Sequence, residues 1–397
     1  MPVDYQQIHA RILQIGAGEY ARQEQLRERT NRALELLNAH AHDLDALREK
    51  AARANDTDPS TRCAVPVNEA LTSSHPCPPL PADVTLIAAD GSQINPNRHD
   101  ALLMGVVNVG AVTMRLNSGE APLLCTNTDL LYGEELETDY GILSDRMVAL
   151  RRDVKEREIF DELSIGLSGA VVTFTDGPIE LWGVKGEEAQ EFAKFVERYK
   201  GVLSRLQTRG VVTAGYVDKP GADLVVRLLE LASMTNDQIA DLQTLRTSHP
   251  FRGVDDVLLY GVLQQPLIFP GHRSAVFGLQ SSSQHAFSGD LALHFFYLNV
   301  GSTGHPALVR VEIPRWVASS PAQLDLLHAV LVEQCGIMGN RPYPYLLHRA
   351  HETAVVTRED KAQIEQMLMQ ELMRHGEPMR EKSSKQTAKD LPGRKSI

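Results

Sequence analysis

The chain has few cysteines, and they form no pattern that would build a site. The four of them are scattered over 397 residues, with no Cys-x-x-Cys pair: Cys63, Cys77, Cys125 and Cys335. A structural zinc site needs closely spaced ligands, and a small disulfide framework needs a denser set of cysteines. The sequence argues against both, and we expect reduced thiols that act as small buried apolar side chains.

Long apolar runs are missing too. No stretch reaches the roughly 18 to 20 apolar residues that span a bilayer. The N-terminal stretch, MPVDYQQIHARILQIGAGEY, has no basic start followed by an apolar block, which a secretory signal would have. We therefore expect no membrane contact and a cytoplasmic location.

No phosphate-binding loop follows a predicted strand, either as Gly-x-x-x-x-Gly-Lys-Ser/Thr or as Gly-x-Gly-x-x-Gly. This argues against a nucleotide-binding α/β protein. Any ATP-driven movement must then come from a partner chain.

Basic residues do not dominate the charge. The formal net charge is −11, from 40 Lys and Arg against 51 Asp and Glu. This argues against a protein that coats nucleic acid by bulk attraction, although a nuclease can combine an acidic metal site with a local basic channel. Only the end, 377–397, is basic, and it is typical of a disordered tail.

Composition and hydrophobic periodicity divide the rest of the chain into two parts. Residues 1–83 begin with leucines at helical spacing and continue, over 56–83, as a linker rich in Pro, Ser and Thr. Residues 84–376 carry the strand and helix patterns of a single predicted domain.

Within that domain, three strand patterns come in succession and are followed by alternating helices and strands. The predicted strands are 84–90, 101–116, 121–131, 169–176 and 210–218, with helices at 140–163 and 186–208. This order predicts an α/β fold with a mixed sheet flanked by helices. It resembles the ribonuclease H-like fold, here with an N-terminal helical extension.

Two aspartates end strand patterns and precede glycine. They are Asp90 in LIAADGSQI and Asp176 in VVTFTDGPI. Asp-Gly is a common turn pair, but ligands in α/β sheets bind beyond the carboxyl ends of strands, where neighbouring strands would bring both aspartates together. Such carboxylates repel unless a cation neutralises them, and Mg²⁺ or Mn²⁺ prefers oxygen ligands. We expect Gly91 and Gly177 to leave room for a phosphate backbone.

A third carboxylate is expected from the helix between the two strands. RRDVKEREIFDEL offers five: Asp153, Glu156, Glu158, Asp161 and Glu162. Glu156 is the first choice because it starts an apolar stripe that packs on the sheet. Glu158 is the rival, since it continues the face formed by Leu143, Leu150 and Val154.

A late segment, RPYPYLLHRAHETAVV, places His348 and His351 three residues apart on a predicted helix. Without a His-Glu-x-x-His frame this is not a zinc-protease pattern.

With these residues assembled, the chain resembles the NurA family of nucleases. The matching motifs are AADGSQI, the Arg/Glu-rich helix, TFTDGPI, GYVDKP, VRVEIPRW and YPYLLHRAHETA, which together cover residues 84–356. The sequence departs from the family pattern at Pro178 and in an acidic insert, YGEELETDYG, before the helix. The insert leaves the choice of glutamate open.

The resemblance implies a ribonuclease H-like core that holds Mn²⁺ or Mg²⁺ and cuts DNA as an exonuclease and single-strand endonuclease. Asp90, Asp176 and Glu156 would be metal ligands, and His351 a metal ligand or proton-transfer partner. Two ions about 4 Å apart would activate a water and stabilise the leaving 3′ oxygen. The resemblance also implies a homodimer that docks on a hexameric HerA-type translocase ATPase in DNA end resection and repair.

Two further residues are predicted to bind the substrate. Tyr216 would stack on a base or orient the water, and Lys219 would hold a phosphate oxygen. Two other functions share this fold and stay open: a non-catalytic adaptor that docks on an ATPase ring, and the effector nuclease of a defence system.

Overall fold

The computed structural model describes residues 3–138, 141–182, 189–261 and 266–376. The chain forms two compact units, each built from two stretches. The first unit comprises Met1–Pro78 and Val217–Pro321, and the second comprises Pro79–Tyr216 and Ala322–Ile397. The predicted basic tail, 377–397, lies outside the described residues.

This division differs from the predicted single domain over 84–376. Residues 217–321 cluster with 1–78 because strands from both stretches pair: β1 (Cys63–Pro66) is antiparallel to β9 (Phe277–Gln280). The segment 56–83, predicted to be an irregular linker, therefore contains a strand. Its pairing partner lies more than two hundred residues later in the chain, so no local pattern reveals it.

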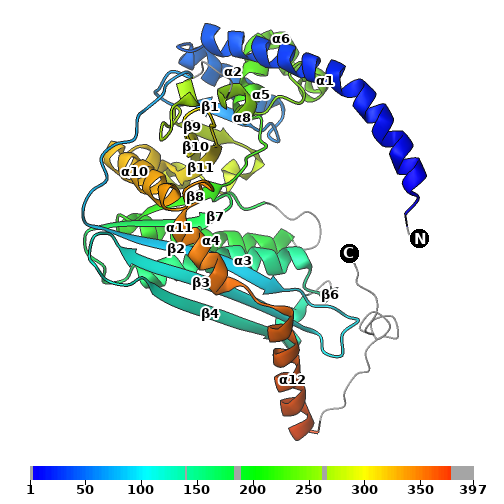
Figure 1. The fold of residues 1–397 in the computed structure, drawn as a ribbon, viewed down its shortest axis with the longest axis vertical. Helices are drawn as coiled ribbons and strands as arrows, with labels where there is room; N and C mark the ends of the chain where they lie inside the picture. The colour runs from blue at the N-terminus through cyan, green and yellow to red at the C-terminus, as the bar shows by residue number, and fades with distance from the viewer. Residues whose placement is uncertain (1–2, 139–140, 183–188, 262–265, 377–397) are drawn as a thin grey trace. The chain divides into compact units, whose positions relative to one another are not determined.

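The second unit holds the predicted mixed sheet. Its strands lie in the order β8-β7-β2-β3-β4 (Figure 1), with bounds β2 (Val84–Ile94), β3 (Met104–Arg115), β4 (Leu123–Tyr132), β7 (Ala170–Asp176) and β8 (Val212–Val217). The pairs β2–β3 and β3–β4 are antiparallel, whereas β2–β7 and β7–β8 are parallel. Apolar side chains fill the buried central strands, as expected where both faces of a sheet are covered. The predicted α/β order with a ribonuclease H-like mixed sheet is confirmed.

Helices cover both faces of this sheet. α3 (Asp145–Leu163) packs on β2 and β3 beside α4 (Ala189–Thr208), and α11 (Tyr345–Ala354) also packs on β2 and β3. A side chain added at Gly91 would meet α3, and one added at Gly110 would meet α11. Gly110 pairs with Asp90, the neighbour of Gly91, so the two glycines point to opposite faces. Figure 1 accordingly shows α11 in front of these strands and α3 behind them.

One strand is longer than predicted. β2 does not end at Asp90 but continues to Ile94, because its antiparallel pairing with β3 runs on to Ile94↔Val106. The parallel pairing with β7, in contrast, stops at Ala89↔Thr175. Asp90 therefore lies inside a strand, at the point where the parallel part of the sheet ends.

The first unit contains the predicted N-terminal helical extension, which consists of two helices, α1 (Tyr5–Ala39) and α2 (Leu44–Thr57). Its strands β1, β9, β10 (Leu293–Asn299) and β11 (Leu308–Pro314) form the antiparallel order β1-β9-β10-β11. Its other α-helices are α5 (Leu224–Ser233), α6 (Asn236–Ala240), α7 (Leu242–Thr247), α8 (Asp256–Gly261) and α9 (Arg315–Ala318). The second unit also contains α12 (Arg358–Arg374), nearly all of α10 (Pro321–Ile337) and the short strands β5 (Glu137–Thr138) and β6 (Gly141–Ile142). In the part of the chain that the structure describes, no helix is both long and apolar enough to cross a membrane.

Candidate functional site

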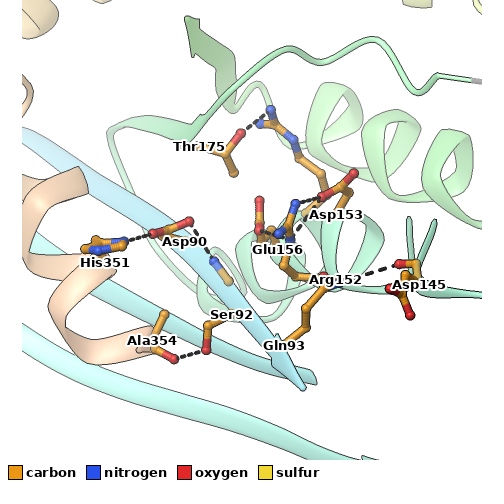
Figure 2. Close-up of polar contacts among 12 residues, drawn as sticks. Asp90, Ser92, Gln93, Asp145, Arg152, Asp153, Glu156, Thr175, His351 and Ala354 are labelled. Atoms are coloured by element: carbon orange, nitrogen blue, oxygen red, sulfur yellow. Dashed lines mark hydrogen bonds and ion pairs between the residues drawn. The ribbon is translucent and has the colours of Figure 1, made fainter. Parts of the chain in front are cut away.

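Asp90 and His351 lie together although 261 residues separate them. The Nδ1 atom of His351, on α11, is 2.7 Å from Oδ2 of Asp90, on β2 (Figure 2). A carboxylate oxygen accepts hydrogen bonds, so Nδ1 is the donor, and in a neutral imidazole Nε2 is then the acceptor. The histidine side chain is 62% exposed and the aspartate side chain 17%. The pair therefore offers solvent an imidazole nitrogen, and the partly buried carboxylate of Asp90 orients the ring.

The backbone of α11 is held directly on the sheet. The carbonyl oxygen of Ala354 accepts hydrogen bonds from Ser92 Oγ at 2.5 Å and from Asn108 Nδ2 at 2.7 Å. A Cβ at Gly110 would lie 2.5 Å from the nitrogen of Ala354, so only glycine permits this approach. These contacts set the position of His351. Neither Ser92 nor Asn108 was predicted to take part in the site, and the only sequence feature that pointed to either of them was the serine of the DGS motif.

Glu156 faces the same region from α3 and is buried, with 6% of the residue exposed. Burial raises its pKa well above the ordinary value, and the charges of Asp153 and Asp90 raise it further, while Arg152 opposes them. The rival, Glu158, instead pairs with Arg198 of α4, with Oε2 2.7 Å from Nη2. Two helical positions turn a side chain by about 200°, which separates the two glutamates. The charge of Asp90 acts on Glu156, whereas Glu158 is held by Arg198.

The positive charge of Arg152 lies beside the carboxylates of Asp153 and Glu156 and offsets part of their negative charge. Its Nη2 is 2.7 Å from Oδ1 of Asp153, and its Nε is 3.4 Å from Oε1 of Glu156. Burial raises the pKa of Asp153, and the neighbouring guanidinium acts in the opposite direction. Figure 2 shows Arg152 among these carboxylates, with Asp90 and His351 nearby.

The role predicted for Gly91 is wrong. A Cβ there would lie 2.4 Å from Arg152 Cγ and 2.6 Å from Glu156 Oε1, so the space beside this glycine is filled by α3 and is not free for a phosphate backbone. Gly177 differs. Its φ of +88° lies in the left-handed region, and no atom lies within 4 Å of an added Cβ, so this glycine is required by its backbone conformation.

Asp176 ends β7 and is exposed, as predicted from the strand pattern. It pairs with Tyr216 of β8, whose carbonyl oxygen accepts a hydrogen bond from the nitrogen of Gly177 at 2.8 Å.

Of the two residues predicted to bind substrate near the end of β8, Tyr216 is buried and Lys219 is exposed. The Tyr216 side chain is fully buried, its ring lies edge-on to Tyr343 at 5.6 Å, and its Oη is 3.6 Å from Sγ of Cys335. Since stacking on a base requires an exposed ring face, the predicted stacking role of Tyr216 is wrong. Lys219 is exposed and belongs to the first unit, and its phosphate contact stays a prediction.

Comparison with known proteins decides the family. The NurA domain model matches residues 84–356. The chain belongs to the NurA domain family. The matched range contains Asp90, Glu156, Asp176 and His351, and it confirms the resemblance seen in the sequence motifs.

Solved structures show distant likeness to the chain. The NurA nuclease from Sulfolobus solfataricus is 12% identical, with a TM-score of 0.47, over 93% of this chain and 98% of that one. The catalytic domain of human Endonuclease V is 14% identical, with a TM-score of 0.29, over 72% and 83%. LC9-RNase H1 is 13% identical, with a TM-score of 0.21, over 36% and 68%. No curated protein matches the chain.

The donor chemistry of this NurA domain fits a hard divalent cation. Asp90 and Glu156 supply carboxylate oxygens. Burial is the main cause of the raised pKa of Glu156, the negative charges of Asp153 and Asp90 add to it, and a bound cation would relieve this repulsion. As the side chains lie, no group of three or more His, Cys, Asp or Glu residues within the described ranges converges on one point. Arg152 supplies the positive charge in this arrangement.

Proposed function

We propose that this NurA-family protein is a divalent-metal-dependent deoxyribonuclease whose site comprises Asp90, Glu156, Asp176 and His351. The observation that carries the proposal is the Asp90–His351 hydrogen bond of 2.7 Å beside the buried Glu156, at the edge where the parallel strands end. Family membership supports it, and the Sulfolobus solfataricus relative is itself named a nuclease.

Each residue has a distinct task in this proposal. Mn²⁺ or Mg²⁺, when bound, would activate a water and stabilise the leaving 3′ oxygen of the phosphodiester. Asp90, Glu156 and Asp176 would hold the cation with oxygen ligands. His351 presents Nε2 to solvent and either completes the ligand set or holds the proton of the attacking water.

The finer features of the function rest on the family alone. We propose exonuclease and single-strand endonuclease activity on DNA, a homodimer, and docking on a hexameric HerA-type ATPase during DNA end processing in the cytoplasm. The sequence carries no phosphate-binding loop at a predicted strand end, which is consistent with a separate chain supplying ATP-driven movement.

The test is cleavage of end-labelled single- and double-stranded DNA in Mn²⁺, Mg²⁺ or EDTA. Asp90→Asn, Glu156→Gln and His351→Gln should each lower the rate about 100-fold or more, because each removes a ligand or proton carrier. Glu158→Gln is the matched control, since its partner is Arg198. It should retain wild-type activity.

Cleavage in EDTA, or cleavage that survives both Asp90→Asn and Glu156→Gln, would contradict the proposal. Wild-type protein that binds the ATPase ring but never cleaves DNA, with or without the ring, would favour the non-catalytic adaptor.

A further inference from the structure

One side chain connects the segments that carry Glu156 and Asp176. Arg157 follows Glu156 on α3, and only 1% of it is exposed. Its Nε donates to Tyr199 Oη at 3.1 Å, its Nη1 to Thr213 Oγ1 at 3.1 Å and the Ala214 carbonyl at 3.0 Å, and its Nη2 to Thr175 Oγ1 at 2.6 Å. Figure 2 shows Thr175 at the end of the last bond. The guanidinium thus joins α3 to α4, β7 and β8.

These four acceptors are uncharged. A buried guanidinium is costly to desolvate, and here uncharged oxygens accept its four hydrogen bonds, while the carboxylates of Asp153 and Glu156 act on it through space. An arginine provides what an apolar residue cannot, namely a rigid fork of donors that reaches several strands at once. The arrangement therefore favours a role in holding segments at a set geometry over a role in bulk stability.

The network holds both flanks of Asp176. Thr175, which accepts from Arg157, directly precedes it. On the other side, Tyr199 Oη donates to the carbonyl of Ile179 at 3.1 Å. The intervening backbone lies against β8, where a Cβ at Gly215 would be 2.5 Å from the Gly177 carbonyl oxygen. The segment before Asp176 is therefore bonded directly to the Arg157 guanidinium, and the segment after it is linked to the same group through Tyr199.

We propose that Arg157 is a positioning residue that sets the separation of the Glu156 and Asp176 carboxylates. The inference rests on the proposed nuclease function, because it concerns two residues of that site. Ligands of one cation must be placed within about 0.2 Å, and these two are carried by different elements, α3 and β7. Arg157 is itself buried beneath the site and would not touch DNA.

The test compares two threonines on the same strand. Thr175→Val removes the acceptor of the 2.6 Å bond from Arg157. Thr173→Val is the control: this buried hydroxyl lies 2.8 Å from Thr213 Oγ1 and 3.3 Å from the Val212 carbonyl oxygen, and it has no bond to the arginine. Arg157→Lys is the second variant, which keeps the charge but loses the fork.

The readouts on the full chain are Mn²⁺ affinity by calorimetry and the kcat and KM of DNA cleavage, with circular dichroism and urea unfolding as fold controls. Thr175→Val and Arg157→Lys should bind Mn²⁺ about 10- to 100-fold more weakly and lose kcat by a similar factor, with KM for DNA unchanged. Thr173→Val should bind Mn²⁺ and cleave as wild type does.

The failures are distinguishable. Wild-type protein that neither binds Mn²⁺ nor cleaves DNA would overturn the proposed function and this inference with it. Active wild-type protein, with Thr175→Val and Thr173→Val equal in Mn²⁺ affinity and kcat, would overturn the positioning role alone and leave Arg157 a stabilising residue.

Discussion

Gly91→Ala tests how closely α3 lies on β2. The new Cβ would sit 2.4 Å from Arg152 Cγ, 2.6 Å from Glu156 Oε1 and 2.8 Å from Arg152 Cδ. Nonbonded carbons prefer separations of about 3.5–4.0 Å, so the arginine stem must move by roughly 1 Å. Overpacking of this kind costs about 1–3 kcal/mol, and we expect the free energy of unfolding to fall by that amount.

The same displacement should reach the site. Moving Arg152 and Glu156 separates the ion pair of 3.4 Å between them and shifts Glu156 relative to Asp90. Misplacement of a catalytic group by about 1 Å can cost roughly 100-fold in rate. We therefore expect Gly91→Ala to lose most DNA cleavage while it still folds cooperatively.

Urea unfolding and the DNA cleavage assay, run on the same preparations, measure both effects. The control is Gly105→Ala on β3, where the nearest atom to an added Cβ is the Ile94 carbonyl oxygen at 3.3 Å, so that small adjustments suffice. If Gly91→Ala matched this control in both unfolding midpoint and cleavage rate, α3 would not lie against Gly91 as described, and the reasoning would fail.

Three further predictions follow from the same structure. Gly110→Ala should lower the free energy of unfolding, measured in urea, by an amount at the upper end of about 1–3 kcal/mol. The added Cβ would meet the backbone of α11 at Ala354, which cannot rotate away as a side chain can. A smaller loss of stability than in Gly105→Ala would contradict this. Tyr216→Phe should leave the rate of DNA cleavage unchanged, because the lost hydroxyl belongs to a buried side chain and lies 3.6 Å from Sγ of Cys335; a slower rate in the cleavage assay would support the other role predicted for Tyr216, in which it orients the water. Burial raises the pKa of Asp256 to about 7, although hydrogen bonds from Tyr297 and the Val225 nitrogen act in the opposite direction. The carboxyl group therefore releases its proton at a lower pH in the unfolded chain than in the folded one. The stability that Asp256 contributes is therefore complete below about pH 4 and is lost as the pH rises towards 7. In a plot of the urea unfolding midpoint against pH, Asp256→Asn should make the curve flatter over this range. An unchanged slope would count against the raised pKa of Asp256.

Local patterns in the sequence predicted much of the second unit. Apolar β-branched runs marked β2, β3 and β7, and the Arg/Glu-rich stretch marked α3. These calls succeed because strand and helix periodicities are local properties of the chain. The two Asp-Gly pairs stood out for the same reason, and family resemblance added His351.

The tertiary structure decided between residues that looked alike in the sequence. Glu156 and Glu158 are two positions apart on one helix, and only the place of Arg198 on a different helix shows which of them has another partner. Tyr216 looked available to DNA, yet its side chain is buried against Tyr343 and Cys335, more than a hundred residues later. Which face of a strand is covered depends on elements that no local pattern identifies.

The sequence by itself determined the types of element, the two aspartates at Asp-Gly pairs and the family. Three contacts could be seen only in the folded chain: α3 fills the space beside Gly91, Ser92 and Asn108 hold α11, and Arg157 joins α3 to α4, β7 and β8. These contacts join residues from 18 to 262 positions apart. Their geometry follows from how helices pack on a sheet, and packing is set by the whole chain at once.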